Sequence, residues 1–259
     1  MTSEINASES SILASLKRSG SLFSLLALSD DLDSLNGLYY NNGTLFTGEA
    51  IKYLNGGLQR STFKDGKPHG LWQITNRVGD PTLLCNYVNG KPNGRWQQWY
   101  PDGKIEIDAN FSDGNYNGSY LEFNEKGKPL IEAYYIDGLE DGEYKEWHSN
   151  GKKAVRATYS LGKPSGRYKE WYEFGKKMLQ IDYIDGKENG KWIQWYPNGK
   201  KEMVLNFKNG IAYGDASFWF ENGSLQARGT IIGDTPNGDW ILQDAGGARR
   251  TMRAKYSKD

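Results

Sequence analysis

The residues of this chain best suited to chemistry are its single cysteine, Cys85, and its two histidines, His69 and His148. Histidine titrates near neutral pH, and a cysteine thiolate can attack a substrate or bind a metal. Their positions argue against both uses. His69 lies in the turn sequence GKPHG, and Cys85 shares its repeat position with alanines. His148 follows Trp147 where other repeats carry a tyrosine (Tyr100, Tyr172, Tyr196). We therefore predict a non-enzymatic protein with no catalytic residue, no metal site and no cofactor.

Aromatic side chains are the second group of residues that could have a function, because Trp, Tyr and Phe make up 14% of the 259 residues. The chain is predicted to be built from repeated β-hairpins, and we expect these rings mainly to stack between neighbouring hairpins and so to supply buried apolar area. Trp and Tyr are also favoured anchors in protein interfaces, so part of the same rows is expected to bind a partner. The candidate partner-binding residues are Trp96, Trp99, Tyr100, Trp147, His148, Trp171, Tyr172, Trp192, Trp195, Tyr196 and Trp219.

These aromatic residues belong to a repeat of 24 residues, marked by three glycine columns. The first column is Gly66, Gly90, Gly114, Gly138, Gly162, Gly186 and Gly210, with Asp234 in the eighth place. The second column runs every 24 residues from Gly70 to Gly238, and the third from Gly79 to Gly247. A degenerate ninth copy precedes them at Gly48, Tyr53 and Gly57. The columns stay in register without an insertion, which indicates one structural unit per 24 residues.

Each unit is expected to be one β-hairpin. After the third glycine apolar residues alternate with polar ones, as in Ile107, Ala109 and Phe111, which is typical of a half-buried strand. After the second glycine come two aromatic residues three places apart, a spacing that predicts a β-bulge or a sharp twist. Turn sequences such as Pro101-Asp102-Gly103 join the two strands.

The predicted fold is therefore all-β, an elongated, single-layer, twisted antiparallel meander of roughly 16 to 18 strands. We assign residues 37–247 to eight or nine repeats. Residues 1–36 are predicted to form a partly disordered cap that covers an open sheet edge. This cap is expected to contain one or two short amphipathic helices between Ser11 and Leu35. Residues 248–259 are predicted to be a basic tail, more consistent with a solvated terminus than with a phosphate- or acid-binding arm.

Charge and hydropathy exclude several classes of function. The 32 Lys and Arg residues balance 32 Asp and Glu, so no net field attracts the chain to nucleic acid or to an anionic membrane. The mean hydropathy of −0.75 and the lack of a long apolar run predict no transmembrane helix. Met1 is followed by Glu4 and serines, and Lys17 and Arg18 interrupt the apolar segment, which argues against a signal peptide. We expect a cytoplasmic protein.

Two segments of the repeat resemble a known family. They are GKPNGRWQQWYPDGK, which begins at Gly90, and GKENGKWIQWYPNGK, which begins at Gly186. They resemble the variant MORN repeat of the bacterial YwqK-type antitoxin family, over about four fifths of the chain. The resemblance implies a twisted single-layer antiparallel sheet and neutralisation of a toxin by direct binding, and it implies no catalytic residues. The last two repeats depart from the pattern, since Ala216 replaces an aromatic residue and Asp234 a glycine.

Two functions of different classes are compatible with these observations. The first is a protein-binding scaffold, most concretely an antitoxin or immunity protein that blocks a toxin or effector. The second is a glycan- or cell-wall-binding module, because regularly spaced Trp and Tyr also suit stacking on sugar rings. Membrane tethering is disfavoured by the zero net charge. Specificity is expected to lie in departures from the repeat, such as His148, Phe174 and Ala216.

Overall fold

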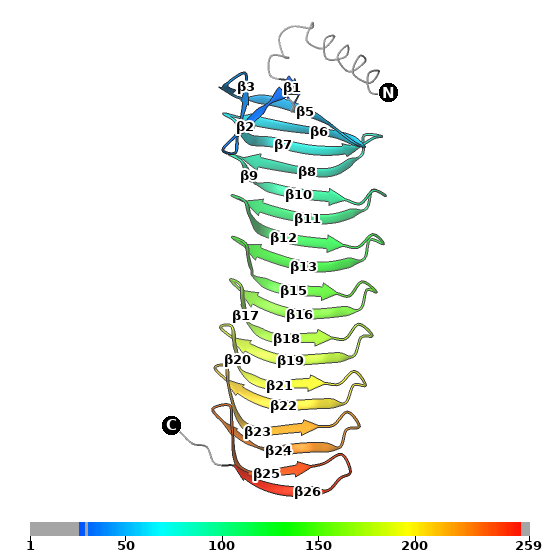
Figure 1. The fold of residues 1–259 in the computed structure, drawn as a ribbon, viewed down its shortest axis with the longest axis vertical. Coiled ribbons are helices and arrows are strands. Elements are labelled where there is room, and N and C mark those ends of the chain that lie inside the picture. Colours follow the sequence, from blue (N-terminus) through cyan, green and yellow to red (C-terminus); the bar gives the residue numbers. More distant parts are fainter. Residues whose placement is uncertain (1–25, 29–30, 255–259) are drawn as a thin grey trace. The chain divides into compact units, whose positions relative to one another are not determined.

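The computed structural model describes residues 26–28 and 31–254. Most of its strands are labelled in Figure 1. The chain forms two compact units: unit 1 contains the described residues up to Ile105 together with Asn110–Asn115, and unit 2 contains Glu106–Ala109 and the residues from Tyr116 onward. The division passes through strand β11 (Ile105–Ser112). The prediction of an all-β fold built from antiparallel hairpins is confirmed.

Unit 1 contains a main sheet and a small three-stranded sheet. The main sheet comprises β1 (Leu26–Leu28), β5 (Gly48–Leu54), β6 (Gly57–Lys64), β7 (Lys67–Asn76), β8 (Pro81–Val88), β9 (Lys91–Pro92) and β10 (Gly94–Trp99). The small sheet comprises β2 (Asp33–Leu35), β3 (Leu38–Asn41) and β4 (Thr44–Leu45). The degenerate repeat copy is the β5–β6 hairpin, which turns at Asn55 and Gly56.

The core of unit 1 lies where the small sheet meets the first hairpins. Phe46, Ala50 and Phe63 are buried together there, and Tyr39 and Trp72 pack against them. Backbone hydrogen bonds fix the contact, because the amide of Tyr39 donates to the carbonyl of Gly66 (2.8 Å) and the amide of Gly66 donates to the carbonyl of Phe46 (2.8 Å). This start of the array is therefore covered by β-structure.

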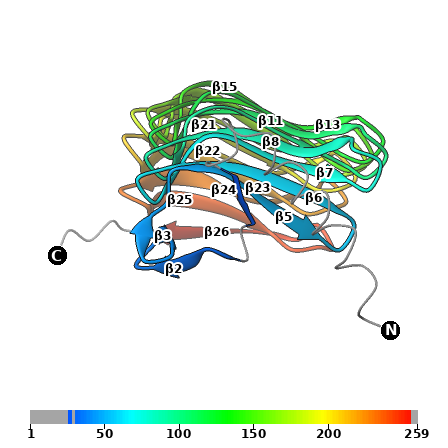
Figure 2. The same ribbon diagram turned by 90° about the horizontal axis from the view of Figure 1, so that it is seen from above.

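Unit 2 repeats one hairpin motif in chain order, and its successive hairpins nearly overlie one another when viewed from above (Figure 2). Its strands are β12 (Asn115–Phe123), β13 (Pro129–Ile136), β14 (Leu139–Glu140), β15 (Gly142–Trp147), β16 (Lys153–Ser160), β17 (Lys163–Pro164), β18 (Gly166–Trp171), β19 (Lys177–Ile184), β20 (Lys187–Glu188), β21 (Gly190–Trp195), β22 (Lys201–Lys208), β23 (Ile211–Trp219), β24 (Leu225–Ile232), β25 (Thr235–Gln243) and β26 (Arg249–Ala254). Equivalent positions therefore form columns.

Two kinds of turn set the 24-residue period. Between hairpins, pairs such as Asp137-Gly138 and Asp185-Gly186 have positive φ at both residues, the geometry of a type I′ turn. Within a hairpin the loop is longer: the amide of Tyr172 donates to the carbonyl of Lys176, and the amide of Gly175 donates back to the carbonyl of Tyr172. Glycine and Asn or Asp recur at these places because the backbone there is left-handed.

The expected irregularity near the aromatic pairs is present as a register shift, but it lies on the partner strand. Glu146 of β15 pairs with Val155, whereas the next residue, Trp147, pairs with Lys153, so Ala154 of β16 is the extra residue. The same shift recurs at Glu170/Trp171 and Gln194/Trp195. The aromatic strand itself continues without interruption.

Both ends of the described chain differ from expectation. Helices were expected between Ser11 and Leu35, but Leu26–Leu28 form strand β1, which pairs in parallel with β5, and Asp33–Leu35 form β2. The helical prediction is therefore wrong for these residues, while residues 1–25 lie outside the described part of the chain. In the predicted basic tail, Arg249–Ala254 form β26, which pairs with β25 and keeps mostly exposed side chains.

Candidate functional site

Each hairpin of unit 2 presents two chemically different faces, because neighbouring side chains of a strand point to opposite sides of the sheet. In β15, Tyr144 and Glu146 share one side, and the Tyr144 hydroxyl donates a hydrogen bond to Glu146 (3.3 Å). Lys145 and Glu143 share the other side and form an ion pair (3.2 Å). Trp147, three residues after Tyr144, follows Lys145 onto that second side. We call the two sides the tyrosine face and the tryptophan face.

The tyrosine face is a ladder of packed rings. Within each hairpin, the first aromatic residue meets a ring on the partner strand over a column of small or aliphatic residues that includes Ala133, Ala157 and Ile181. The centroids are 5.4 to 6.0 Å apart in this unit. The ring pairs are Tyr116–Tyr135, Tyr120–Tyr135, Tyr144–Tyr159, Tyr168–Tyr183 and Trp192–Phe207. These rings were expected to stack between neighbouring hairpins, but each of these pairs lies within one hairpin, because the two rings sit near each other on its paired strands.

Carboxylates accompany the tyrosines on this face. The hydroxyls of Tyr120 and Tyr168 donate to Glu122 (2.8 Å) and Glu170 (2.6 Å), as Tyr144 does to Glu146. Burial raises the pKa of Tyr168, and the hydrogen bond and negative charge of Glu170 raise it further. Glu146 and Glu170 each follow a lysine in the sequence, Lys145 and Lys169. The lysines lie on the opposite face, because consecutive residues of a strand point to opposite sides of the sheet.

The tryptophan face carries paired charges of both signs. Lys145 contacts Glu132 and Glu143 (both 3.2 Å), and Arg156 contacts Glu143 (2.8 Å). In the next hairpin along the chain, Arg167 pairs with Asp182 (2.8 Å). At one end of four of these hairpins lies a half-buried indole: Trp147, Trp171, Trp195 and Trp219. The ammonium groups of Lys153 and Lys177 lie 6.0 and 5.5 Å from the ring centroids of Trp171 and Trp195.

The turns beside these indoles are joined from one hairpin to the next. The Tyr172 hydroxyl donates to the carbonyl of Trp195 (2.7 Å), and Tyr196 donates to Trp219 (2.8 Å). His148 takes the place of a tyrosine, and its Nε2 lies 2.8 Å from the carbonyl of Trp171. Because a carbonyl only accepts, Nε2 carries the proton. The sequence therefore placed His148 correctly as a substituted repeat position.

We call the series of hydrogen bonds made by His148, Tyr172 and Tyr196 the turn ladder. Neighbouring turn residues add further hydrogen bonds to it. The amides of Asn150 and Asn198 donate to the carbonyls of Glu173 (2.8 Å) and Glu221 (2.6 Å) in the following turn. Phe174 replaces the asparagine in the intervening turn, where its ring stacks on Tyr172 at 5.2 Å and 8° and stays 49% exposed. Phe174 is thus an exposed departure from the repeat.

In unit 1 the predicted site residues are likewise half-buried. The Trp96 ring packs on Phe111 with centroids 5.5 Å apart. Trp99 is the last residue of β10, and Tyr100 opens the following turn, where its amide bonds to the carbonyl of Lys104 (2.9 Å) and its carbonyl accepts from Gly103 (2.9 Å). The predicted residues thus occupy three columns, and the structure does not gather them into one pocket.

The last hairpins replace the ring ladder by a compact apolar cluster. Ala212, Ala216, Ile231 and Trp240 are buried together. Ala216 leaves the place of a ring empty and faces Gly229 across the strand pair, and the Trp240 indole lies over Gly229. This departure is explained as packing.

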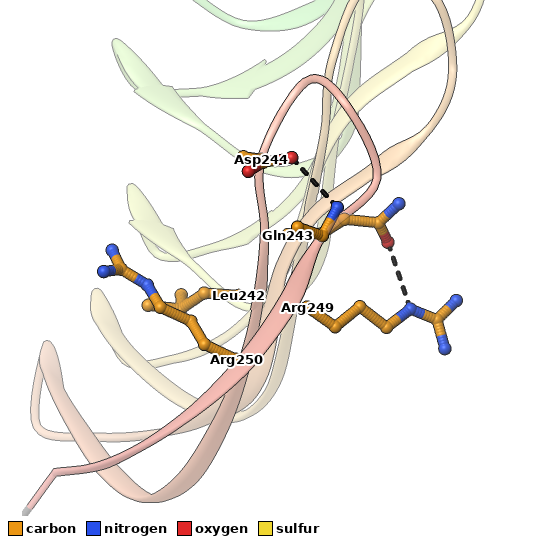
Figure 3. A pocket seen from close by; sticks show the side chains of 6 residues that line it. Leu242, Gln243, Asp244, Arg249 and Arg250 are labelled. Carbon is orange, nitrogen blue, oxygen red and sulfur yellow. Dashed lines mark hydrogen bonds between the residues drawn. The ribbon is translucent and has the colours of Figure 1, made fainter.

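The remaining concave and nucleophilic features offer little chemistry. A shallow cavity of about 320 Å³ lies beside Leu242, Gln243, Asp244 and the arginines of β26; Arg249 and Arg250 extend in different directions (Figure 3), and Arg249 donates to the Gln243 side chain (3.3 Å). Cys85 is buried as expected, and burial raises the pKa of its thiol to about 12. Over the described residues, no cluster of three metal-ligating side chains occurs and no helix is able to span a membrane.

Comparison with known families supports the repeat assignment. Residues 92–113, 140–160, 164–185 and 188–209 match a family model described as a MORN repeat variant. Each match begins in a short strand and runs through the hairpin that follows. Repeats of this family are non-catalytic modules that bind proteins or membranes. Comparison of the chain with curated proteins gave no match.

Proposed function

We propose that this chain is a non-catalytic protein-binding scaffold of the cytoplasm, and more specifically an antitoxin or immunity protein that neutralises a toxin by direct binding. The observation that carries the proposal is the set of half-buried indoles on the tryptophan face, Trp147, Trp171, Trp195 and Trp219, held in register by the turn ladder. Preordered aromatic side chains with a polar surround are typical of interface anchors, since little entropy is lost when they bind.

The repeat motif supports the same function. Four segments match a module that generally serves in binding, and their sequences resemble those of YwqK-type antitoxins. Sugar binding has less support. A sugar stacks on an open ring face, whereas the tyrosine-face rings pack against one another, as Tyr144 does on Tyr159 at 74°. The protein-binding proposal therefore comes first.

The test is co-expression of the full-length chain with the product of a neighbouring gene in the native host. We expect a stoichiometric complex that survives moderate salt, and relief of the growth arrest that the neighbour causes when expressed alone. A complex without relief of toxicity would retain the scaffold and reject the antitoxin role. Failure to form a complex, together with retention of the chain on polysaccharide, would replace the proposal by glycan binding.

A further inference from the structure

From β12 through β21, the strand residues on the tyrosine face of unit 2 carry charge of one sign, although the whole chain is neutral. The strand alternation directs five carboxylates to this face from β12 through β21: Glu122, Glu140, Glu146, Glu170 and Glu188. The same alternation directs the lysines and arginines of these strands, such as Lys145, Arg156 and Arg167, to the tryptophan face. The tyrosine face of these strands is therefore acidic, although positive and negative residues are equal in number over the whole chain.

The carboxylates of this face have no cationic partners of their own. Within the described part of the chain, none of the five forms an ion pair, whereas Glu132, Glu143 and Asp182 of the tryptophan face all do. Three of the five accept a tyrosine hydroxyl, which orients the carboxylate but leaves its charge in place. All five are half-buried. Their mutual repulsion is relieved only by positive charge from outside these strands.

The spacing of the carboxylates suits an extended chain. Glu122, Glu146 and Glu170 occupy one column, and each is two strands from the next, or about 10 Å at ~4.8 Å per strand. A peptide in the extended polyproline II conformation advances ~3.1 Å per residue with three residues per turn, so every third side chain returns to the same side after about 9 Å. Arginine matches both components of the face, since its guanidinium binds carboxylate oxygens in pairs and stacks on aromatic rings.

We propose that the tyrosine face of unit 2 binds an extended, arginine- and lysine-rich segment of a partner protein, with a basic residue at about every third position. This inference rests on the proposed scaffold function and specifies the chemistry of the partner. Charge complementarity selects this occupant. An anionic membrane or a nucleic acid meets repulsion on this face, and a neutral glycan gains nothing from the carboxylates.

The probe is a fluorescein-labelled peptide, (Arg-Gly-Ser)4, titrated with the full-length protein and followed by fluorescence anisotropy at low and moderate salt. The comparison peptide is (Glu-Gly-Ser)4. We expect saturable binding of the arginine peptide alone, weakened by salt. Equal binding of both peptides, or of neither, would overturn the proposal.

Matched variants locate the site. The double variant Glu146→Gln/Glu170→Gln removes two charges from the tyrosine face, and Gln194 already occupies the same column in the next hairpin, so glutamine fits there. The double variant Glu132→Gln/Glu143→Gln removes the same charge from the tryptophan face of neighbouring strands. Each lost charge pair costs about two- to fivefold in affinity, so the first variant is expected to raise Kd about four- to 25-fold. The second should change Kd less than about twofold.

The two variants also separate this inference from the scaffold proposal. Equal weakening by both would show that only net charge matters and would overturn the assignment to the tyrosine face. If the native partner binds the protein but is not displaced by the arginine peptide, the basic-segment inference fails while the scaffold function stands. If no native protein binds, the scaffold proposal fails on its own test, and the peptide titration still decides whether the face binds arginine.

Discussion

Gly229 of β24 provides a sharp test of how the last hairpins pack. A methyl carbon added at Gly229 would lie 2.6 Å from Cγ of the Trp240 indole, and closer still to Cδ2 and Cε2. Trp240 is only 5% exposed and is enclosed by Ala212, Ala216 and Ile231, so the ring has little room to move. The variant Gly229→Ala therefore overpacks this cluster.

The expected magnitude follows from two opposing contributions. Gly229 does not have a positive φ, so alanine suits its backbone and alone would stabilise the strand by about 0.5–1 kcal/mol. Overpacking of a tight core costs about 1–3 kcal/mol, and a clash with three ring atoms belongs near the upper end. We expect Gly229→Ala to lower the free energy of unfolding by about 2 kcal/mol.

A double-mutant cycle measures the clash directly. Trp240→Leu removes the ring atoms that the new methyl would meet, so in that background Gly229→Ala should be neutral or stabilising. Urea unfolding of the four proteins, followed by circular dichroism, then gives a coupling energy of about 2–3 kcal/mol. If Gly229→Ala has the same effect in both backgrounds, within about 0.5 kcal/mol, the packing argument is refuted.

Three further predictions concern the turn ladder, the tyrosine face and the buried thiol. Tyr196→Phe removes the hydrogen bond to the Trp219 carbonyl and should cost about 0.5–1.5 kcal/mol in urea unfolding, whereas His148→Tyr restores the repeat residue and should be nearly neutral; equal losses in both would contradict the ladder. The raised pKa of Tyr168 and its neighbours means that the folded state holds these protons more tightly, so their stabilisation is complete below about pH 10 and is lost as pH rises above it. Tyrosinate absorbance should accordingly rise in two phases, the later one with unfolding, and a single phase near pH 10 would count against this. Because burial raises the pKa of Cys85 to about 12, a thiol reagent at pH 8 should react with the native protein far more slowly than with the urea-unfolded protein, and equal rates would show that the thiol is accessible.

The sequence predicted the hairpins well because the information is local. Paired positive-φ residues such as Asp185 and Gly186 require turn residues, and the alternation after each loop requires strands. The bulge was predicted from the spacing of the aromatic residues, but it lies on the partner strand, at Ala154. Spacing within one strand carries no information about which strand absorbs the extra residue.

The prediction failed where the decisive contacts are tertiary. Leu26–Leu28 lie in an apolar stretch that also fits an amphipathic helix, and only the free edge of β5 makes them a strand. The acidic tyrosine face was not predicted, because Lys145 and Glu146 are neighbours in sequence and only the alternation of the strand separates their charges. The signal was present in the shared column of Glu122, Glu146 and Glu170.

The turn ladder also has a direction. His148, Tyr172 and Tyr196 each bond to a carbonyl 23 residues further along the chain. Phe220, at the next equivalent position, has no polar group to continue the series. During synthesis on the ribosome each of these donor side chains therefore emerges before its acceptor carbonyl. The newest hairpin lacks this hydrogen bond until the next hairpin has been made. The series of side-chain hydrogen bonds therefore ends before Phe220, and the sequence itself sets where it ends.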